Sequence, residues 1–524
     1  MKVVVTSKQT IKPSNQTLHY LCQLKLSFLD QKQQPYFVLF VYFYASRLNK
    51  AISVRRRSEK LKKSLSKTLS WFYPLVGRVK DNLFVDYNNE GMPFFEAQVE
   101  SNLDHVVGQS NYKSQFNNLF PYHDFDDASD LLLAVQVNFF HCGGMAIGLC
   151  TSYKIADALS VVMFMKFWAA VSLGDHSNLV YPQFGLANIF PPTLNPNTNH
   201  HKYGVGTTKN KIIAKSFMFN NFTISTLKTK YTPTTTTATT VTANNKTIHN
   251  NPTHVEALST FIWCRYMAAT RGETVCREGI TFLVNQGVNL CTKFNPLLPN
   301  SYYGNLSQVA MLLLAPLPLK KDASGEDCGS LVTQMRDGIR KVYNDFVRKL
   351  QEGGGGGMEG LNSKKDEGGG DGGVSGMKGL NSKKKEGGNK RGGEVVFSLM
   401  FSSLARFPLY ETDFEWGRPV WVTFGVASLD NTVVFFPTRS GDGIEALIFS
   451  NEGDLAKREV DKEFLSFVPL LLTTRKLTFC VYFFATVYLT VAKNIQHFPR
   501  MICKSLRHTS HLYDSPVSKD MDKD

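Results

Sequence analysis

The residues best suited to chemistry lie at a turn between an apolar strand and an apolar helix. In the stretch NFFHCGGMAIGLCTSYKIADALSVVMFMKFWAA, residues 138–170, Tyr153 and Asp157 stand four residues apart at this turn. Asp157 directly precedes the helical run, so it is a natural N-cap. An ordinary phenol has a pKa of about 10 and donates protons at neutral pH. Tyr153 could act as a base only if its surroundings lowered that pKa by about 3 units, roughly 4 kcal/mol.

Other groups that could support catalysis are weaker candidates. His141 lies 12 residues before Tyr153, on the far side of a strand and turn, and we expect it at the surface. The remaining histidines lack the spacing of metal ligands, so we expect no metal. The glycines of CGGMAIG match neither a dinucleotide-binding loop nor a P-loop, and no G-x-S-x-G hydrolase elbow occurs. We therefore expect no bound cofactor.

The elements that position this turn alternate between strands and helices. Residues 58–78 place apolar side chains at helical spacing, and the helix should end near Tyr73 because Pro74 disfavours helical geometry before it. Residues 82–100 read as a hairpin with NNEG as its turn. This alternation predicts an N-terminal α/β domain over residues 1–185.

A second α/β domain is expected over residues 213–468, after a crossover loop at 186–212. Residues 352–392 repeat MEGLNSKK as MKGLNSKK among glycines and charges, and their lack of an apolar face predicts a disordered insertion. Residues 469–524 form an extra C-terminal tail. Its stretch 477–492 has 16 uncharged residues, short of the about 20 that span a membrane. We expect this stretch to be a weak candidate for a membrane anchor, and a membrane-tethered variant is left open as an alternative.

Charge and cysteine usage exclude some function classes. The 524 residues carry a formal net charge of +15, of which +9 belongs to the body outside the insertion and tail. No zinc-finger, RNA-recognition or helix-turn-helix signature accompanies this charge, so we expect no nucleic-acid partner. The nine cysteines form no C-x-x-C pair, and the first residues contain no secretory segment. We expect a cytoplasmic protein with reduced thiols.

Several long motifs, in the same order, resemble the plant acyl-CoA-dependent acyltransferases of the BAHD family, in particular their vinorine-synthase-like branch. The turn at 153–157 resembles the family's H-x-x-x-D motif, and DFEWG at 413–417 resembles its D-F-G-W-G signature. Further resemblances lie at residues 61–82, 251–269, 288–305, 401–422 and 440–468.

This resemblance implies an α/β fold of two chloramphenicol-acetyltransferase-like domains, with mixed sheets, flanking helices and a channel between them. It implies acyl-CoA as co-substrate, an alcohol or amine of a plant specialised metabolite such as an alkaloid as acceptor, and a monomer. In the family, the histidine takes the proton of the acceptor, and the aspartate is structural and pairs with an arginine.

Three positions depart from the family pattern. Tyr153 replaces the histidine, Cys291 stands where the arginine is expected, and Glu415 replaces a glycine. Lys293 is a candidate substitute partner for Asp157. The residues expected on the CoA side, or in a structural role, are Ser402, Ser403, Arg406, Asp413, Trp416 and Gly417.

Two functions remain open from the sequence. One is an acyltransferase that is impaired because its base is missing, with orientation and a preorganised carbonyl site still accelerating transfer. The other is a non-catalytic protein that binds CoA or a metabolite.

Overall fold

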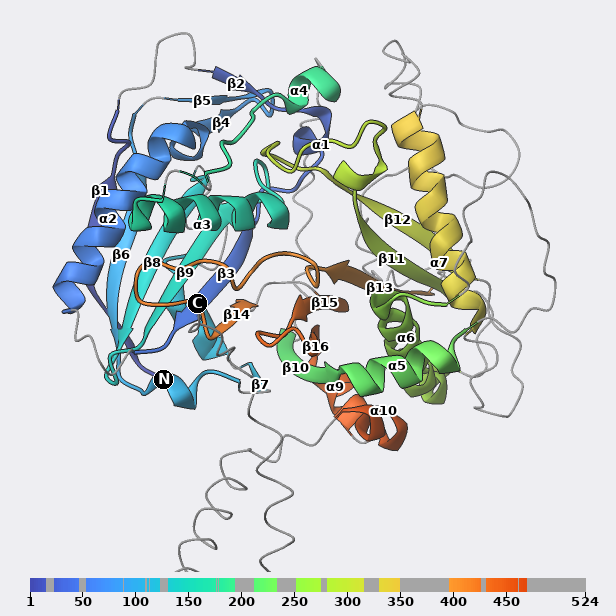
Figure 1. Cartoon of the computed structure of the whole chain (residues 1–524). Coiled ribbons are helices and arrows are strands. Elements are labelled where there is room, and N and C mark those ends of the chain that lie inside the picture. The colour runs from blue at the N-terminus through green and yellow to red at the C-terminus, as the bar shows by residue number, and fades with distance from the viewer. Residues whose placement is uncertain are drawn as a thin grey trace, which may run out of the picture. The chain divides into compact units, whose positions relative to one another are not determined.

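The computed structural model describes residues 1–15, 23–46, 53–87, 89–108, 111–112, 114–122, 131–175, 177, 179–193, 212–232, 251–274, 280–314, 329–348, 395–425, 430–459 and 461–468. Residues 1–468 form one compact unit. Figure 1 shows its strands and helices.

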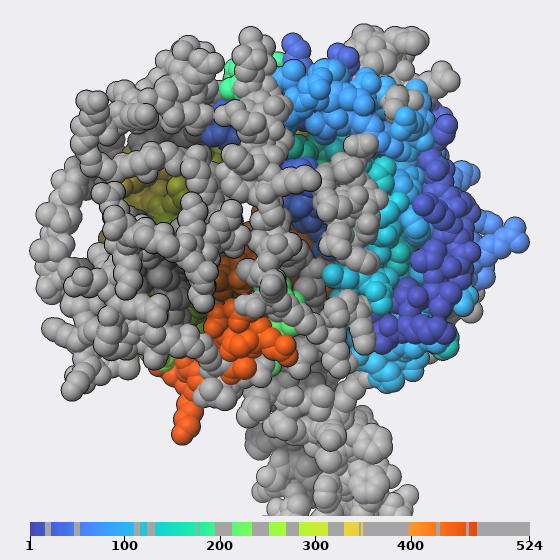
Figure 2. Space-filling view, turned by 180° about the vertical axis from the view of Figure 1, so that it is seen from behind, coloured from blue at the N-terminus to red at the C-terminus, as the bar shows by residue number. Residues whose placement is uncertain are grey.

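The first sheet has six strands in the order β1 (Val3–Ile11), β6 (Met92–Val99), β8 (Leu133–Phe140), β9 (Met145–Ser152), β3 (Phe37–Tyr44) and β14 (Trp421–Phe424). Neighbouring strands are antiparallel except β6 and β8, which are parallel. Every residue of β8 and β9 is buried, as their continuous apolar runs predict. The edge strand β1, dark blue in Figure 2, contributes to the outer surface.

Two helices, α2 (Val54–Trp71) and α3 (Ala158–Leu173), lie side by side over the first sheet (Figure 1). Leu61, Leu65 and Leu69 of α2 are fully buried, at the spacing predicted for its inner face. The helix ends at Trp71, and Pro74 lies in the 3-10 turn η2 (Tyr73–Val76) that follows. The predicted end of this helix is confirmed.

The hairpin predicted for residues 82–100 is wrong. Residues Phe84–Asp86 (β5) pair with β4 (Arg78–Lys80) and β2 (Gln23–Lys25) in a small separate sheet, whereas β6 joins the first sheet. The turn itself is present, with Gly91 at positive φ. The strand after it is buried between β1 and β8, so apolar burial outweighs pairing with its neighbour in sequence.

The second sheet has seven strands in the order β12 (Ser307–Leu314), β11 (Ile280–Asn289), β13 (Val395–Ser403), β15 (Thr432–Pro437), β16 (Gly443–Asn451), β10 (Ile212–Asn220) and β7 (Asn111–Tyr112). Its helices are α5 (Asn221–Lys230), α6 (His254–Thr274), α7 (Gly329–Lys341), α9 (Glu452–Glu459) and α10 (Lys462–Phe467). A π-helical turn, Val342–Val347, extends α7. Short helices α1 (Phe28–Gln31) and α4 (Leu186–Ile189) complete the described body, with 3-10 turns at Leu103–His105, Ser114–Leu119 and Cys291–Lys293.

The two sheets exchange strands. The late strand β14 pairs with β3 in the first sheet, and the early strand β7 pairs with β10 in the second. A bridge between Gln183 and Tyr302 adds another link. The predicted mixed α/β fold is therefore confirmed, and the chain order of the two halves is crossed at two strands.

Several predicted segments lie outside the described residues. These are the insertion at 352–392, the tail at 469–524 with its stretch 477–492, and residues 194–211 of the crossover loop. Within the described part, no helix is both long and apolar enough to cross a membrane. Cys142, Cys150 and Cys291 are free thiols, but Cys264 is disulfide-bonded, so the expectation of reduced thiols is wrong there.

Candidate functional site

Tyr153 lies where the two halves of the chain meet. Its backbone N–H donates to the carbonyl of Tyr36 at 2.9 Å, and its own carbonyl accepts from the Asn305 side chain at 2.9 Å. The Tyr153 ring stacks on the Tyr36 ring, with centroids 5.0 Å apart and an angle of 12° between the planes. Its hydroxyl is hydrogen-bonded to the side chain of Ser307, the first residue of β12.

The surroundings of Tyr153 keep its hydroxyl protonated. Burial raises the pKa of Tyr153 above its usual value, the charge of Asp157 raises it further, and the Ser307 hydrogen bond opposes both. This direction is the reverse of what a general base at neutral pH requires. Tyr36, against which the ring packs, also has a raised pKa because of burial and because Tyr153 is close.

Asp157 caps helix α3. One carboxylate oxygen accepts from the N–H of Ser160 at 2.9 Å, and the other accepts from the N–H of Leu306 at 3.0 Å. The residue is 8% exposed, and burial raises the pKa of its carboxyl group, with the hydrogen bonds opposing this rise. The sequence prediction of an N-cap is confirmed, and the second bond ties α3 to the other half of the chain.

The turn at Gly304–Asn305 locks against the same helix start. The hydroxyl of Ser160 donates to the Gly304 carbonyl at 2.9 Å and accepts from the Gly304 N–H at 3.0 Å. Gly304 has a φ of 139°, and a Cβ there would lie 2.4 Å from the Leu186 side chain. Only glycine fits this position.

Two buried charged residues, Asp30 and Lys154, lie next to the Gly304–Asn305 turn and to each other. That they meet was not predicted from the sequence. Asp30 completes the capping box of α1 with Ser27, and it accepts two bonds from Asn305, from its backbone N–H at 3.0 Å and its side chain at 2.9 Å. The ammonium group of Lys154 donates to the Asn82 side chain at 2.7 Å and to the Gln31 carbonyl at 3.0 Å. Burial lowers the pKa of Lys154 to about 8 despite the nearby Asp30.

The position predicted to have lost an arginine is close to Asp157. Cys291 is 1% exposed, and burial together with the charge of Asp157 raises the pKa of its thiol to about 12. Among the described residues, no lysine or arginine forms an ion pair with Asp157, and Lys293 does not do so. Asp157 is therefore held by backbone N–H groups instead of a cation.

His141 cannot take over the role of the base. It is exposed in the turn between β8 and β9, at the opposite end of β9 from Tyr153. The eight residues of β9 at about 3.3 Å each separate the two by more than 20 Å. The surface position expected for His141 is confirmed.

The predicted CoA-side residues at the end of β13 lie beside a basic cluster. Ser402 and Ser403 are partly exposed on β13, and Arg406 is exposed just after it. His254, the first residue of α6, has a pKa lowered by burial and by the charges of Lys228 and Arg406. Lys228, His254 and Arg406 thus form one cluster near a helix N-terminus, a setting suited to phosphate groups. The sequence indicated only Arg406.

The loop with the sequence DFEWG, residues 413–417, packs into the core of the first sheet. Asp413 accepts from the N–H groups of Glu415 at 2.8 Å and Gly417 at 2.9 Å. The Trp416 ring stacks on Phe414, which in turn contacts Trp168 of α3 edge-on. These contacts support a structural role for the loop, and a direct role in CoA binding stays a prediction.

Glu415 adopts backbone geometry that favours glycine. Its φ is 94°, in the region where L-residues are strained. Its carboxylate pairs with Lys60 of α2. Position 415, where the family pattern has glycine, thus has a backbone conformation that favours glycine, and the glutamate carries the strain.

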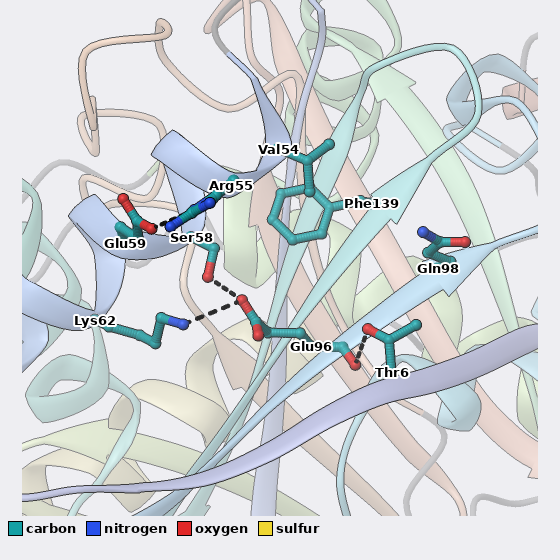
Figure 3. Close-up of a pocket in the computed structure, with 9 residues that line it drawn as sticks. All are labelled: Thr6, Val54, Arg55, Ser58, Glu59, Lys62, Glu96, Gln98 and Phe139. Carbon is teal, nitrogen blue, oxygen red and sulfur yellow. Dashed lines mark hydrogen bonds and ion pairs between the residues drawn. The ribbon is translucent and has the colours of Figure 1, made fainter.

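One pocket of about 450 Å³ lies away from these residues. It is formed by α2, β1, β6 and β8, and Figure 3 shows Glu96 on its floor, bonded to Ser58 and paired with Lys62 at 3.5 Å. Its charges are compensated within the pocket, and it contains none of the predicted site residues. In the described part of the chain, no group of three or more potential metal ligands gathers.

Comparisons with known proteins agree with the geometry. The model of the Transferase family matches residues 1–465. The limonoid 7-O-acetyltransferase of Citrus sinensis is 31% identical, covering 90% of this chain and 99% of its own length. The stemmadenine O-acetyltransferase of Catharanthus roseus is 29% identical over 88% and 97%, respectively.

Solved structures give the same result. The crystal structure of vinorine synthase has a TM-score of 0.67 and 28% identity, covering 89% of this chain and 98% of that one. TRI101 of F. sporotrichioides, solved with coenzyme A and T-2, has a TM-score of 0.59 at 16% identity, covering 84% and 98%. TRI101 shares the fold alone.

Proposed function

We propose that this protein transfers an acetyl or related acyl group to a plant specialised metabolite. The chain belongs to the Transferase family, the BAHD family of acyl-CoA-dependent acyltransferases. Three named relatives are vinorine synthase and acetyltransferases of stemmadenine and a limonoid. Their names favour a hydroxyl of an alkaloid or of a similar polycyclic compound as the acceptor, with an amine as the less favoured alternative.

The proposed reaction needs an acceptor for the proton of the attacking hydroxyl, and Tyr153 is poorly suited to that role. The acceptor oxygen attacks the thioester carbon, the tetrahedral intermediate collapses with cleavage of the C–S bond, and CoA leaves as the thiolate, which takes up a proton. Tyr153 occupies the family position of the base, with a pKa raised by burial and by Asp157. That observation carries the proposal of weak turnover, with the acceptor proton passing to water.

The basic cluster supplies the proposed anchor for acyl-CoA. Lys228, His254 and Arg406 come from α5, α6 and the segment after β13, and the pKa of the His254 imidazole is lowered by burial and by the charges of both Lys228 and Arg406. CoA carries several phosphates, which such a cluster recognises by charge-assisted hydrogen bonds. We assign the phosphates to these residues, and Ser402 and Ser403 to the neighbouring part of the CoA.

A non-catalytic CoA- or metabolite-binding protein is the second candidate. It is favoured by the same protonated Tyr153 and by Cys291, which leaves Asp157 without a cation among the described residues. Such a protein would bind CoA through Lys228, His254 and Arg406 but would not catalyse acyl transfer.

Two measurements on the full-length chain separate these candidates. CoA binding is measured by calorimetry and by protection against heat unfolding, and turnover by mass spectrometry with acetyl-CoA and a panel of alkaloid and terpenoid alcohols. We expect Arg406→Ala to weaken CoA binding about 10-fold, since a charge-assisted bond contributes about 1.5 kcal/mol or more. Arg340→Ala is the control, because Arg340 is exposed on α7 and pairs only with Asp337 in the described structure.

The outcomes discriminate as follows. Slow acetylation of any alcohol, with CoA binding that depends on Arg406, supports the transferase. CoA binding without turnover supports the binding protein. If CoA does not bind at all, both proposals fail.

We further propose that the protein acts as a monomer in the cytoplasm, where acyl-CoA is available, and that its domains are 1–185 and 213–468. Size-exclusion chromatography with light scattering and cell fractionation test the first two statements.

A further inference from the structure

One face of helix α2 presents cations and a tryptophan to solvent. Arg56, Lys63, Lys67 and Trp71 are all exposed, and they follow one another at intervals of seven, four and four residues. Such intervals place side chains on the same side of a helix. At about 1.5 Å per residue, the four side chains span roughly 22 Å. We call these four residues the outer face of α2.

The cations of the outer face have no acidic partner in the described structure. The other exposed or half-exposed charged residues of α2 are paired: Arg55 with Glu59, Lys60 with Glu415 and Lys62 with Glu96. Arg57 is buried and donates to the carbonyl of Gly143. By contrast, no ion pair among the described residues involves Arg56, Lys63 or Lys67. The outer face thus carries three uncompensated positive charges.

A fourth cation lies beside this face. The carbonyl of Lys12 accepts a hydrogen bond from the Ser66 hydroxyl of α2 at 2.8 Å, and Lys12 is exposed. Ser14 bonds to the carbonyl of Ser66 at 2.9 Å and to the hydroxyl of Ser70. The segment after β1 is therefore fixed along α2 and adds to its positive charge.

The C-terminal end of the outer face is apolar. Trp71 is 51% exposed, Tyr181 45% and Val180 55%. The Trp71 and Tyr181 rings contact each other, with centroids 4.5 Å apart and an angle of 60°. Tyr181 also packs on buried Phe167, so this apolar tip has a fixed position on the fold.

We propose that the outer face of α2 binds the surface of an anionic membrane. Arg56, Lys63 and Lys67 would lie against the anionic headgroups, and Trp71 with Tyr181 and Val180 would enter the interface. Tryptophan and tyrosine favour the boundary between headgroups and acyl chains, and cations beside them are attracted to anionic lipid. This proposal is independent of the proposed acyl transfer.

The shape of the face favours a lipid surface over nucleic acid. A single-stranded nucleic acid needs a basic groove and flat rings open for base stacking. Here the cations follow one exposed face of helix α2, and the Trp71 and Tyr181 rings are tilted by 60° against each other instead of standing open for stacking. A row of cations that ends in exposed apolar side chains fits the surface of an anionic membrane, where charged headgroups lie beside an apolar interior.

Vesicle co-sedimentation of the full-length chain tests the proposal. We use phosphatidylcholine vesicles with and without about one-third phosphatidylserine, at low and high ionic strength. We expect binding to the anionic vesicles only, weakening at high salt because screening shortens the range of the attraction. Lys63→Glu with Lys67→Glu should lower the partition coefficient about 10-fold or more, and Trp71→Ala about 3-fold or more.

Matched variants distinguish binding through the outer face of α2 from binding that depends on the net charge of the protein or on its C-terminal tail. Lys341→Glu with Lys462→Glu changes charge equally at exposed positions of α7 and α10 and should leave binding unchanged. Lys63→Arg with Lys67→Arg should preserve it. The proposal is overturned if the Lys63 and Lys67 reversals bind like wild type, if neutral vesicles bind equally well, or if a short single-stranded RNA binds through these lysines and the vesicles do not.

Discussion

Replacing Tyr153 with histidine restores an imidazole at the position where the structure holds a protonated phenol. The backbone around the residue is fixed by bonds from its N–H to Tyr36 and from Asn305 to its carbonyl, and neither depends on the side chain. Asp157 is held by the N–H groups of Ser160 and Leu306, so the turn keeps its shape without a partner cation. One substitution is therefore enough for the test.

The expected gain follows from the role of a general base. An unperturbed imidazole has a pKa of about 6.5 and is mostly neutral at pH 7, whereas burial and Asp157 raise the pKa of Tyr153. A positioned base contributes about 10²- to 10⁴-fold, which is roughly 2.7 to 5.5 kcal/mol of transition-state stabilisation. We expect Tyr153→His to raise kcat/KM for acetyl transfer by a factor in this range.

The assay is CoA release from acetyl-CoA with a panel of alcohols, followed by mass spectrometry of the ester. The histidine variant should gain activity as pH rises through the pKa of the imidazole, a limb that wild type lacks. Tyr153→Phe is the control: it removes only the hydroxyl and should change kcat/KM less than about 3-fold if that group is no base. Wild-type activity equal to that of the histidine variant, or abolished in the phenylalanine variant, would refute the reasoning.

Three further predictions concern stability, measured by urea unfolding. Glu415→Gly should raise the free energy of unfolding by about 0.5–1 kcal/mol, because relief of about 1–2 kcal/mol of backbone strain exceeds the loss of a partly exposed ion pair with Lys60. Glu415→Ala keeps the strained backbone and should not stabilise the fold. Because the pKa of Asp157 is raised in the folded state, its contribution to the free energy of unfolding is present at acid pH and is lost as pH rises through the folded-state pKa. Asp157→Asn should therefore flatten the fall in wild-type stability from acid to neutral pH. An unchanged slope of stability against pH would contradict this. Lys154→Met should cost about 1–3 kcal/mol, because it leaves the side-chain oxygen of Asn82 unpaired and removes one of the two hydrogen bonds to the Gln31 carbonyl. Because Lys154 has a pKa of about 8 when folded, wild type should gain stability above that pH as the buried amine loses its proton, and the methionine variant should lack this gain.

Local features of the site were predictable from the sequence because they depend on neighbouring residues. The N-cap at Asp157 and the end of α2 before Pro74 are set by side-chain chemistry within a few residues. The order of the family motifs also predicted the mixed α/β fold.

Features that join distant segments were not predictable. Lys154 meets the Asn82 side chain across 72 residues, and Asn305 meets Asp30 across 275. The grouping of Lys228 and His254 with Arg406 likewise arises only when α5, α6 and the end of β13 fold together. Residue spacing carries no signal for such contacts, and the same limit produced the wrong hairpin at 82–100, whose strands belong to different sheets.

Each half of the chain contributes one strand to the sheet of the other half, because β14 pairs with β3 and β7 pairs with β10. The two halves therefore depend on each other for complete sheets. A polypeptide cut between residues 193 and 212 would leave β3 without β14 and β10 without β7, and each fragment would expose an unpaired edge that invites aggregation. Neither half of this scaffold can therefore be removed without exposing a strand edge of the other.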